Sequence, residues 1–258
     1  MKIFFKQSGD GFPLLILHGL FGMSDNWATL SKSYVENGFT VYAIDQRNHG
    51  RSDHSFIFNY EAMADDLFEL TSNENLSKVN IIGHSMGGKT AMQFTLMHPE
   101  LVNKLVVGDI SPGQYPPHHK SVLLALNSVD LKVVKTRKEV ETLLRISLKD
   151  EGTIQFLLKN LYWKNEDELD WRFALKEIEA NIDHVGDSLP GNEMITIPTL
   201  FLRGERSGYI NEENEKIIRE RFSNSTIETI SNAGHWLHAE NPTAFLVRTL
   251  NFFNDKNS

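Results

Sequence analysis

The 258-residue sequence contains no cysteine, which excludes disulfide bonds and thiolate metal sites. A reducing compartment is the simplest interpretation, so we expect a cytoplasmic protein. Positive charge is also scarce, because 26 Lys and Arg residues face 34 Asp and Glu residues and leave a formal net charge of -8. Nucleic-acid binding needs a basic surface that displaces counterions, so we expect no nucleic-acid partner.

Long apolar runs are absent too. No window approaches the ~18 uninterrupted apolar residues of a membrane helix, so no membrane span is expected. Met1–Phe5 is short and, apart from Lys2, apolar, but Lys6 and Asp10 interrupt the run and no small-residue cleavage site follows. We therefore predict a first strand there and not a signal peptide. The length fits one large domain or a domain with a sizeable insertion.

Short apolar runs alternate with amphipathic stretches along most of the chain. The runs have strand length and near-continuous apolar character, as in parallel strands that are covered on both faces. This alternation predicts an α/β fold with a mostly parallel central sheet flanked by helices. The predicted strands are Leu14–Leu17, Thr40–Ile44, Val79–Ile82, Leu105–Val107, Thr199–Leu202 and Ile227–Ile230, and the helices are Asn26–Glu36, Tyr60–Leu70, Ser85–His98, Glu212–Arg221 and Thr243–Phe253.

One interval breaks this rhythm. Ser111–Leu189 contains no strand candidate and has helical patterns over Ser128–Lys149 and Thr153–Leu161. A long helical insertion between two strands of a sheet is typical of a second domain or of a cap over a site. We therefore predict a core of residues 1–110 and 191–258, with residues 111–190 as a helical cap.

A Gly-x-Ser-x-Gly motif spans residues 83–87 and is centred on Ser85. It follows the apolar run Val79–Ile82 and precedes a helical pattern that begins at Met86. A sharp strand-to-helix turn needs small residues beside the serine and exposes its hydroxyl above the sheet. The alternative is that these glycines only permit close packing of strand and helix. The strand and helix context favours Ser85 as a nucleophile.

A second glycine-containing loop, residues 18–22 (HGLFG), follows the run Leu14–Leu17. In hydrolases with this elbow, the corresponding loop supplies one backbone N–H of the oxyanion hole, and the residue after the nucleophile supplies the other. We therefore predict Leu20 and Met86 as the donors, with Phe21 as second choice for the first. The alternative is an ordinary glycine turn.

A candidate base, His235, lies in the segment Asn232–Trp236 after the last predicted strand. A histidine there reaches over the sheet edge, takes the serine proton and returns it to the leaving group. In α/β proteins with such an elbow the serine precedes the histidine in the chain, and the same order is found here. His238 is three residues further on, and we interpret it as a packing or supporting residue.

Six blocks of sequence, spread from near the N-terminus to near the C-terminus, form a larger pattern. They are Leu17–Gly22 (LHGLFG), Asp45–Ser52 (DQRNHGRS), Gly83–Ala91 (GHSMGGKTA), Asp109–Pro112 (DISP), Phe156–Leu161 (FLLKNL) and Ala233–Glu240 (AGHWLHAE). Together they resemble the YbfF-type esterases and their mitochondrial relatives within the α/β-hydrolase superfamily. The resemblance implies hydrolysis of short acyl esters, with acyl-CoA thioesters as a further substrate class, and it implies no cofactor.

The acid that orients His235 departs from the commonest pattern of the fold. That pattern has an aspartate three residues after Gly204, where this sequence has Ser207. Asp109 lies at the end of the strand that contains Leu105–Val107, on the same edge of the sheet as the elbow. Glu205 is a rival earlier in the turn. The resemblance implies that the acid is Asp109, with Ser207 beside the histidine.

Three other groups of residues have plainer interpretations. The cluster Asp45–His49 is predicted to brace neighbouring loops through bonds to backbone groups. His118 and His119 lack the further ligands that a metal site would need, so no metal is expected. Four aromatic residues of the predicted cap are expected to fasten it to the sheet, with an acyl pocket as the alternative. They are Tyr162, Trp163, Trp171 and Phe173.

The main functional prediction is a serine hydrolase whose partner is a small acyl ester or acyl-CoA. Hydrolysis of a carbon–carbon bond in a diketone uses the same serine and histidine and is the enzymatic alternative. A non-catalytic binding protein with this fold is the other alternative. It is disfavoured because binding alone does not require Ser85, His235 and the glycines of the oxyanion loop together.

Overall fold

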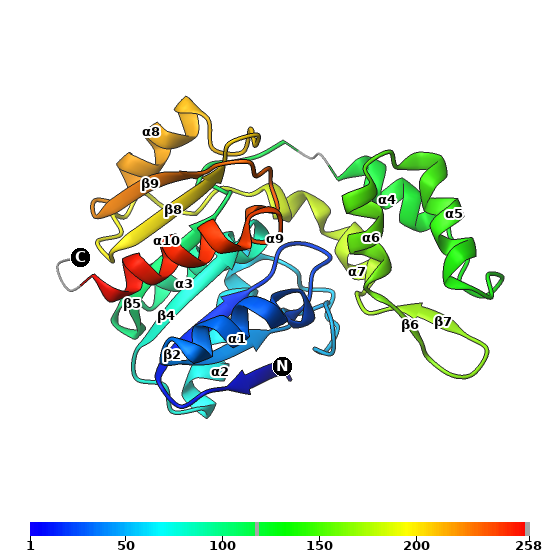
Figure 1. Ribbon diagram of the computed structural model, residues 1–258, viewed down its shortest axis with the longest axis horizontal. Coiled ribbons are helices and arrows are strands. Elements are labelled where there is room, and N and C mark those ends of the chain that lie inside the picture. Colours follow the sequence, from blue (N-terminus) through cyan, green and yellow to red (C-terminus); the bar gives the residue numbers. More distant parts are fainter. Residues whose placement is uncertain (117–118, 256–258) are drawn as a thin grey trace.

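The computed structural model describes residues 1–116 and 119–255 and has a central seven-stranded sheet (Figure 1). The strand order is β1-β3-β2-β4-β5-β8-β9, and all strands run parallel except β1, which pairs antiparallel with β3 at one edge. The predicted mostly parallel sheet is therefore confirmed. The strands are β1 (Phe5–Ser8), β2 (Phe12–Leu17), β3 (Phe39–Ile44), β4 (Val79–His84), β5 (Val102–Gly108), β8 (Thr199–Gly204) and β9 (Ser225–Ile230).

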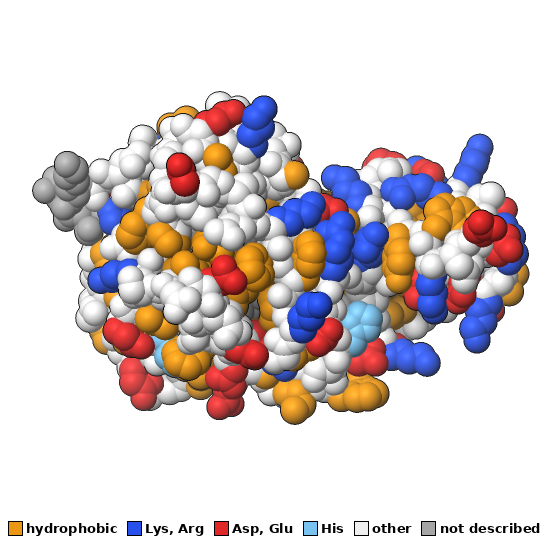
Figure 2. Space-filling model, turned by 90° about the horizontal axis from the view of Figure 1, so that it is seen from below, with side chains coloured by type: hydrophobic (Ala, Val, Ile, Leu, Met, Phe, Trp, Pro, Cys, Tyr) orange, Lys and Arg blue, Asp and Glu red, His pale blue; other side chains and the backbone are white. Residues whose placement is uncertain are grey.

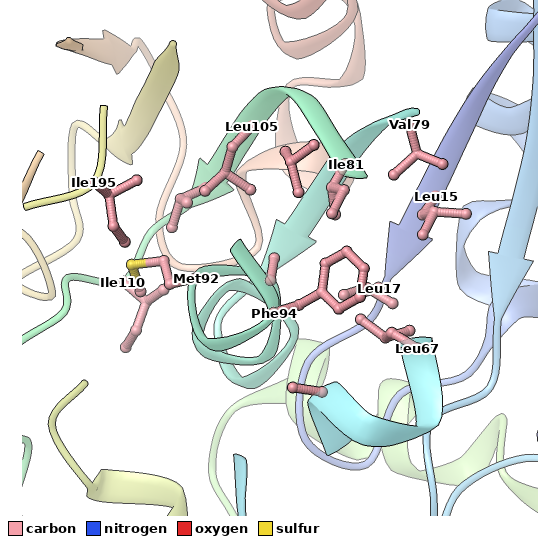
Figure 3. Packing of buried hydrophobic residues seen from close by; sticks show 14 of the residues in the cluster. Leu15, Leu17, Leu67, Val79, Ile81, Met92, Phe94, Leu105, Ile110 and Ile195 are labelled. Atoms are coloured by element: carbon pink, nitrogen blue, oxygen red, sulfur yellow. The ribbon is translucent and has the colours of Figure 1, made fainter. Parts of the chain in front are cut away.

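Helices cover both faces of the sheet. Successive strand residues point to opposite faces, and the central strands are apolar at nearly every position, so both faces must be buried. Leu14 and Ile16 of β2 pack in one core, with the first and last long helices, and Leu15 and Leu17 pack in the other. Figure 3 shows the second core around Phe94. The helices of the first face are α1 (Ala28–Glu36), α9 (Leu237–Glu240) and α10 (Pro242–Asn254), and those of the second are α2 (Tyr60–Asn73), α3 (Met86–Met97) and α8 (Glu212–Arg221).

Between β5 and β8 the chain leaves the sheet and forms a separate lobe (green in Figure 1). A third apolar core joins this lobe to the sheet, since cap residues such as Leu157 cluster with Leu20, Phe21 and Met86. Figure 2 shows Lys and Arg side chains over this lobe and at its junction with the core. The boundaries 111–190 stay a prediction. The elements are α4 (Lys120–Asn127), α5 (Arg137–Ser147), α6 (Glu151–Leu158), β6 (Leu161–Trp163), β7 (Leu169–Trp171) and α7 (Leu175–Ala180).

The prediction of no strand in this interval was wrong, because β6 and β7 form an antiparallel hairpin. Each strand has only three residues, too few for a period-two pattern to stand out. The helix predicted over Ser128–Lys149 begins only at Arg137, where the side chain of Thr136 accepts a hydrogen bond from the Glu139 amide. Such a cap satisfies a free N–H group and therefore defines the start of the helix.

The first strand also differs from its predicted span. It begins at Phe5 and not at Met1, because Phe5 pairs with Ile44, the last residue of β3. Residues before Phe5 have no strand partner there. They are held by other contacts, including the Phe4 amide, which donates to the Ser52 hydroxyl at 2.8 Å.

Two glycines allow close contact at the turn between β4 and α3. A Cβ at Gly83 would lie 2.3 Å from the carbonyl oxygen of Gly87, and one at Gly87 would lie 2.5 Å from that of Leu17. Both obstacles are backbone atoms, which cannot rotate away. The elbow therefore needs glycine at these two positions, and the end of β2 lies directly against the start of α3.

We expect Gly87→Ala to lower the free energy of unfolding by about 1–3 kcal/mol or more, since its Cβ overlaps backbone on a neighbouring segment. Gly208→Ala is the matched control, because a Cβ there meets nothing within 4 Å. The control should stay within about 0.5 kcal/mol of the wild type. Urea unfolding of both variants measures the difference, and equal midpoints would contradict this account of the elbow.

Four buried histidines surround the elbow and the loop after β2. Burial lowers the pKa of His18 to about 4 and the pKa values of His49 and His238 to about 3, and it also lowers the pKa of His84. All four are therefore neutral in the folded protein near neutral pH. In the unfolded chain each takes up a proton below the ordinary histidine pKa of about 6.5.

We therefore expect the protein to lose stability as the pH falls below about 6.5, the value at which the unfolded chain begins to bind more protons than the folded one. Each buried histidine contributes up to about 1.4 kcal/mol per pH unit until its folded pKa is reached. Above about pH 6.5 this contribution to stability is fully present. Urea unfolding from pH 7.5 to 5 measures the slope, and a flat profile across that range would contradict the prediction.

Candidate active site

Ser85 occupies the turn between β4 and α3 in a left-handed conformation, with φ 53° and ψ -120°. Such a φ is strained for a residue with a side chain, and the strain is held by the surrounding backbone. The Ser85 amide donates to the carbonyl of Gly108 at 2.9 Å. The turn leaves the hydroxyl at the wall of a cavity and places the Met86 amide in the first turn of α3.

His235 lies on the loop between β9 and α9, and its ring faces Ser85. The Nε2 atom lies 3.1 Å from the Ser85 Oγ. The ring of Tyr209 stacks on the imidazole at a centroid distance of 4.0 Å, and His84 bonds to the His235 carbonyl at 2.8 Å. These contacts hold the imidazole over the hydroxyl, so the pair predicted from sequence lies within hydrogen-bonding distance.

Asp109 follows β5, is fully buried and has φ 51°. Its Oδ2 lies 2.7 Å from Nδ1 of His235 and also accepts a hydrogen bond from the Ser207 hydroxyl. Its Oδ1 accepts from the Gly204 amide at 3.1 Å. Bonding to a carboxylate at Nδ1 leaves Nε2 as the ring atom that can accept a proton from Ser85.

The rival acid, Glu205, is directed elsewhere. Its Oε2 accepts a hydrogen bond from the Asn232 amide at 2.7 Å, which fastens the turn before His235. The structure therefore brings Ser85, His235 and Asp109 together, with Ser207 beside the carboxylate. Glu205 braces the loop and is not part of this group.

The loop after β2 distinguishes between Leu20 and Phe21, the two candidates for the first oxyanion donor. The Phe21 amide donates to Nε2 of His49 at 3.0 Å and is therefore engaged. The Leu20 amide has no hydrogen-bond acceptor among the described residues. Leu20, Ser85 and His235 line the same cavity, and the Met86 amide stands at the helix N-terminus next to it. The geometry thus favours Leu20 and Met86 over Phe21.

The cavity at Ser85 has a volume of about 190 Å³. Its core side carries the polar residues of the site, and its cap side is mainly apolar. Lining residues to which the sequence had given no individual role include Asn26, Trp27, Val122, Thr153, Phe156, Leu157, Tyr209 and Trp236. Phe156 and Leu157 belong to the FLLKNL block, so the family resemblance already contained a signal for them.

None of the four cap aromatics named from sequence lines this cavity. Trp171 and Phe173 are buried and stacked at 5.3 Å, as the core interpretation predicted. Trp163 is 53% exposed, and Tyr162 packs under the guanidinium of Arg172. For Trp163 the core interpretation was wrong, because more than half of its side chain is exposed, whereas Tyr162 is half-buried.

The remaining polar clusters have structural contacts. The Asp45 carboxylate accepts hydrogen bonds from the amides of Ser24 and Arg51, and so braces two loops as predicted. His238 stacks on Trp27 at a centroid distance of 4.2 Å and an interplanar angle of 6°. Its Nδ1 is buried and has no partner in the described chain. This is the packing role expected for His238.

The described residues offer neither a metal site nor a membrane-crossing helix. Within residues 1–116 and 119–255, no three histidine, aspartate or glutamate side chains are grouped in a way that could hold a metal ion. His119 lines the cavity at Ser85, whereas His118 lies outside the described residues. No helix in the same ranges is long and apolar enough to cross a membrane.

Comparison with known proteins places this geometry in a family. Residues 13–139 match the family model described as alpha/beta hydrolase fold. A putative esterase/lipase of Haemophilus influenzae is 40% identical over 98% of this chain and 86% of its own length. Esterase YbfF of Escherichia coli is 34% identical over 97% of this chain and 96% of its own.

Further relatives extend the same picture. An sn-1-specific diacylglycerol lipase of Danio rerio is 38% identical over 96% of this chain and 80% of its own length. A solved structure, a marine microorganism esterase, is 45% identical with a TM-score of 0.95 and covers 97% of this chain and 99% of its own. The protein therefore belongs to the α/β-hydrolase fold family, and within it to the YbfF-type esterases.

Proposed function

We propose that the protein hydrolyses carboxylic esters with a short acyl group through an acyl-enzyme on Ser85. The observation that carries the proposal is the chain of contacts from Ser85 through His235 to Asp109, at 3.1 and 2.7 Å, in the wall of one cavity. A binding protein would not need a nucleophile, a base and an acid in this order. The esterase and lipase names of the relatives support the same reaction.

The reaction follows from the positions of the atoms. Nε2 of His235 takes the hydroxyl proton as the Ser85 Oγ forms a bond to the ester carbonyl carbon. The carbonyl oxygen becomes negative and accepts hydrogen bonds from the Leu20 and Met86 amides. The bond to the alkoxy oxygen then breaks, and Nε2 returns its proton to the departing alcohol. A water molecule then gives a proton to Nε2 of His235 and attacks the acyl carbon. The bond to Ser85 Oγ breaks, and Nε2 returns the proton to Ser85 as the acid is released.

Asp109 stabilises the imidazolium that forms at His235. Its carboxylate is buried and receives hydrogen bonds from Ser207 and Gly204 as well as from the imidazole. The buried neighbours His84 and His238 have lowered pKa values and stay neutral, so no second positive charge opposes the imidazolium. Charge stabilisation at His235 therefore comes from Asp109, with Ser207 as a hydrogen-bonding partner of that carboxylate.

The cavity supports a small acyl group. Its volume of about 190 Å³ is below the roughly 300–1,000 Å³ of pockets for drug-sized ligands, and Phe156 and Leu157 give it an apolar wall. The same attack by Ser85 applies to acyl-CoA thioesters, where the thiol leaves. It also applies to diketones in the keto form, where the carbon–carbon bond breaks and the leaving enolate takes the proton from His235. Measuring kcat/KM for p-nitrophenyl esters and acyl-CoAs of graded chain length, and for a diketone, separates these substrate classes. Highest kcat/KM with long-chain esters would overturn the proposed acyl size.

We expect Ser85→Ala to abolish ester hydrolysis, with a loss in kcat of several orders of magnitude, because no other nucleophile is placed at the elbow. A fluorophosphonate probe should label Ser85 in the wild type and leave the variant unlabelled, as mass spectrometry of the tryptic peptide would show. A folded variant that retained near-normal kcat would exclude the serine mechanism.

We expect Asp109→Asn to lower kcat by roughly 10⁴, the loss known for the corresponding substitution in serine proteases, because the amide favours the wrong histidine tautomer. Steady-state kinetics with p-nitrophenyl acetate would measure it.

Two control variants belong to this prediction. Ser207→Ala removes one hydrogen bond to the carboxylate and should lower kcat far less than Asp109→Asn. Glu205→Gln should leave kcat almost unchanged, since its carboxylate bonds to the Asn232 amide and not to His235. A Glu205→Gln variant as slow as Asp109→Asn would reassign the acid.

A further inference from the structure

Phe21, next to the candidate oxyanion donor, is held in a strained turn. The Gly22 amide donates to the Gly19 carbonyl at 2.9 Å, so residues 19–22 form a β-turn. Phe21, its third residue, has φ 60°, whereas Leu20 keeps a negative φ. This combination defines a type II turn, which normally has glycine at the third position. A type I turn would relieve Phe21, but it requires the peptide between Leu20 and Phe21 to flip.

The first restraint on that flip comes from the core. His49 belongs to the DQRNHGRS turn, and its Nε2 lies 3.0 Å from the Phe21 amide nitrogen. The His49 Nδ1 lies 2.9 Å from the carbonyl oxygen of Arg47, so the proton sits on Nδ1 and Nε2 is free to accept. Burial lowers the pKa of His49 to about 3, so this acceptor persists at neutral pH. The contact is lost if the Leu20–Phe21 peptide flips.

The cap holds the next peptide of the turn, between Phe21 and Gly22, together with the Phe21 ring. Asn160 lies between α6 and β6 and is fully buried. Its Nδ2 donates to the Phe21 carbonyl at 2.8 Å and, within the cap, to the Phe156 carbonyl at 3.4 Å. The ring of Phe173 packs on the ring of Phe21 at a centroid distance of 4.9 Å. The Oδ1 of Asn160 is buried and has no hydrogen-bond partner among the described residues. An unpaired buried oxygen lowers the stability of the fold, so stability does not explain an asparagine at this position.

The geometry points to Asn160 of the cap and His49 of the core as positioning residues that jointly hold the oxyanion loop in its type II form. The cap then completes the active site as well as covering it. This inference rests on the proposed ester hydrolysis. It assigns a role to two sequence blocks, DQRNHGRS and FLLKNL, that the triad itself does not use.

The consequence concerns the transition state. The Leu20 amide belongs to the same turn, so a flipped peptide beside it disturbs the donor where negative charge develops. The substrate before reaction carries little charge on that oxygen and is affected much less. Loss of either restraint should therefore lower kcat and leave KM nearly unchanged.

The first experiment replaces Asn160 with leucine, which has a similar shape, and compares it with Asn127→Leu. Asn127 is an exposed cap residue whose Nδ2 bonds only within the cap, to Glu179 at 2.7 Å. We expect Asn160→Leu to lower kcat about 10- to 100-fold, below the roughly 10²–10³-fold loss for a deleted oxyanion donor. Its KM should stay within about threefold and its thermal midpoint near that of the wild type. Asn127→Leu should keep wild-type kinetics.

An inhibitor supplies a readout that a purely structural defect would not give. A trifluoromethyl ketone forms a tetrahedral adduct with Ser85 and places an oxyanion in the same hole. Its inhibition constant should rise in Asn160→Leu by about the factor lost in kcat/KM, with no change in Asn127→Leu. A kcat within twofold of the wild type in folded Asn160→Leu, or a loss confined to KM, would overturn the inference.

The core side provides an independent pair of variants that does not depend on cap folding. His49→Leu removes the acceptor for the Phe21 amide and should show the same selective loss in kcat. His49→Gln retains an acceptor oxygen and should restore most of the rate. Equal losses in both variants would contradict a positioning role. A wild type without esterase activity would instead refute the proposed function, so the two failures are distinguishable.

Discussion

The contact of bare backbone at Gly83 and Gly87 is the constraint on which the rest of the site depends. Because no side chain separates them, β4, α3 and the end of β2 meet at van der Waals distance. This contact gives Ser85 its left-handed turn and places the start of α3 beside the loop that carries Leu20. One steric requirement therefore brings together the nucleophile and both candidate oxyanion donors.

The parallel sheet supplies the remaining polar groups from the same edge. Asp109 follows β5, Ser207 follows β8 and His235 follows β9, and all three strands end at that edge. The site thus draws its acid from the strand beside β4 and fills the more usual acid position with a neutral hydroxyl. Asp109 and Ser207 both act on His235, because the Asp109 carboxylate reaches its Nδ1 and the Ser207 hydroxyl bonds to that carboxylate.

The cap covers the active site and also contacts the loop that carries Leu20. Its apolar residues form one continuous core with Leu20, Phe21 and Met86, so cap packing and loop geometry are coupled. Its residues Phe156 and Leu157 also narrow the cavity at Ser85. Burial around the site keeps four histidines neutral, which leaves Asp109 as the charged partner of His235.

The sequence by itself determined the features that depend on local spacing. Apolar runs placed the sheet strands, the Gly-x-Ser-x-Gly motif placed Ser85, and the glycine before His235 marked its loop. Only the tertiary structure decided between Asp109 and Glu205, revealed the cap hairpin and brought the cap block containing Phe156 to the cavity. The physical reason is that the hydrophobic pattern of neighbouring residues determines where strands and helices form. The direction of a side chain depends on packing between segments distant in the chain.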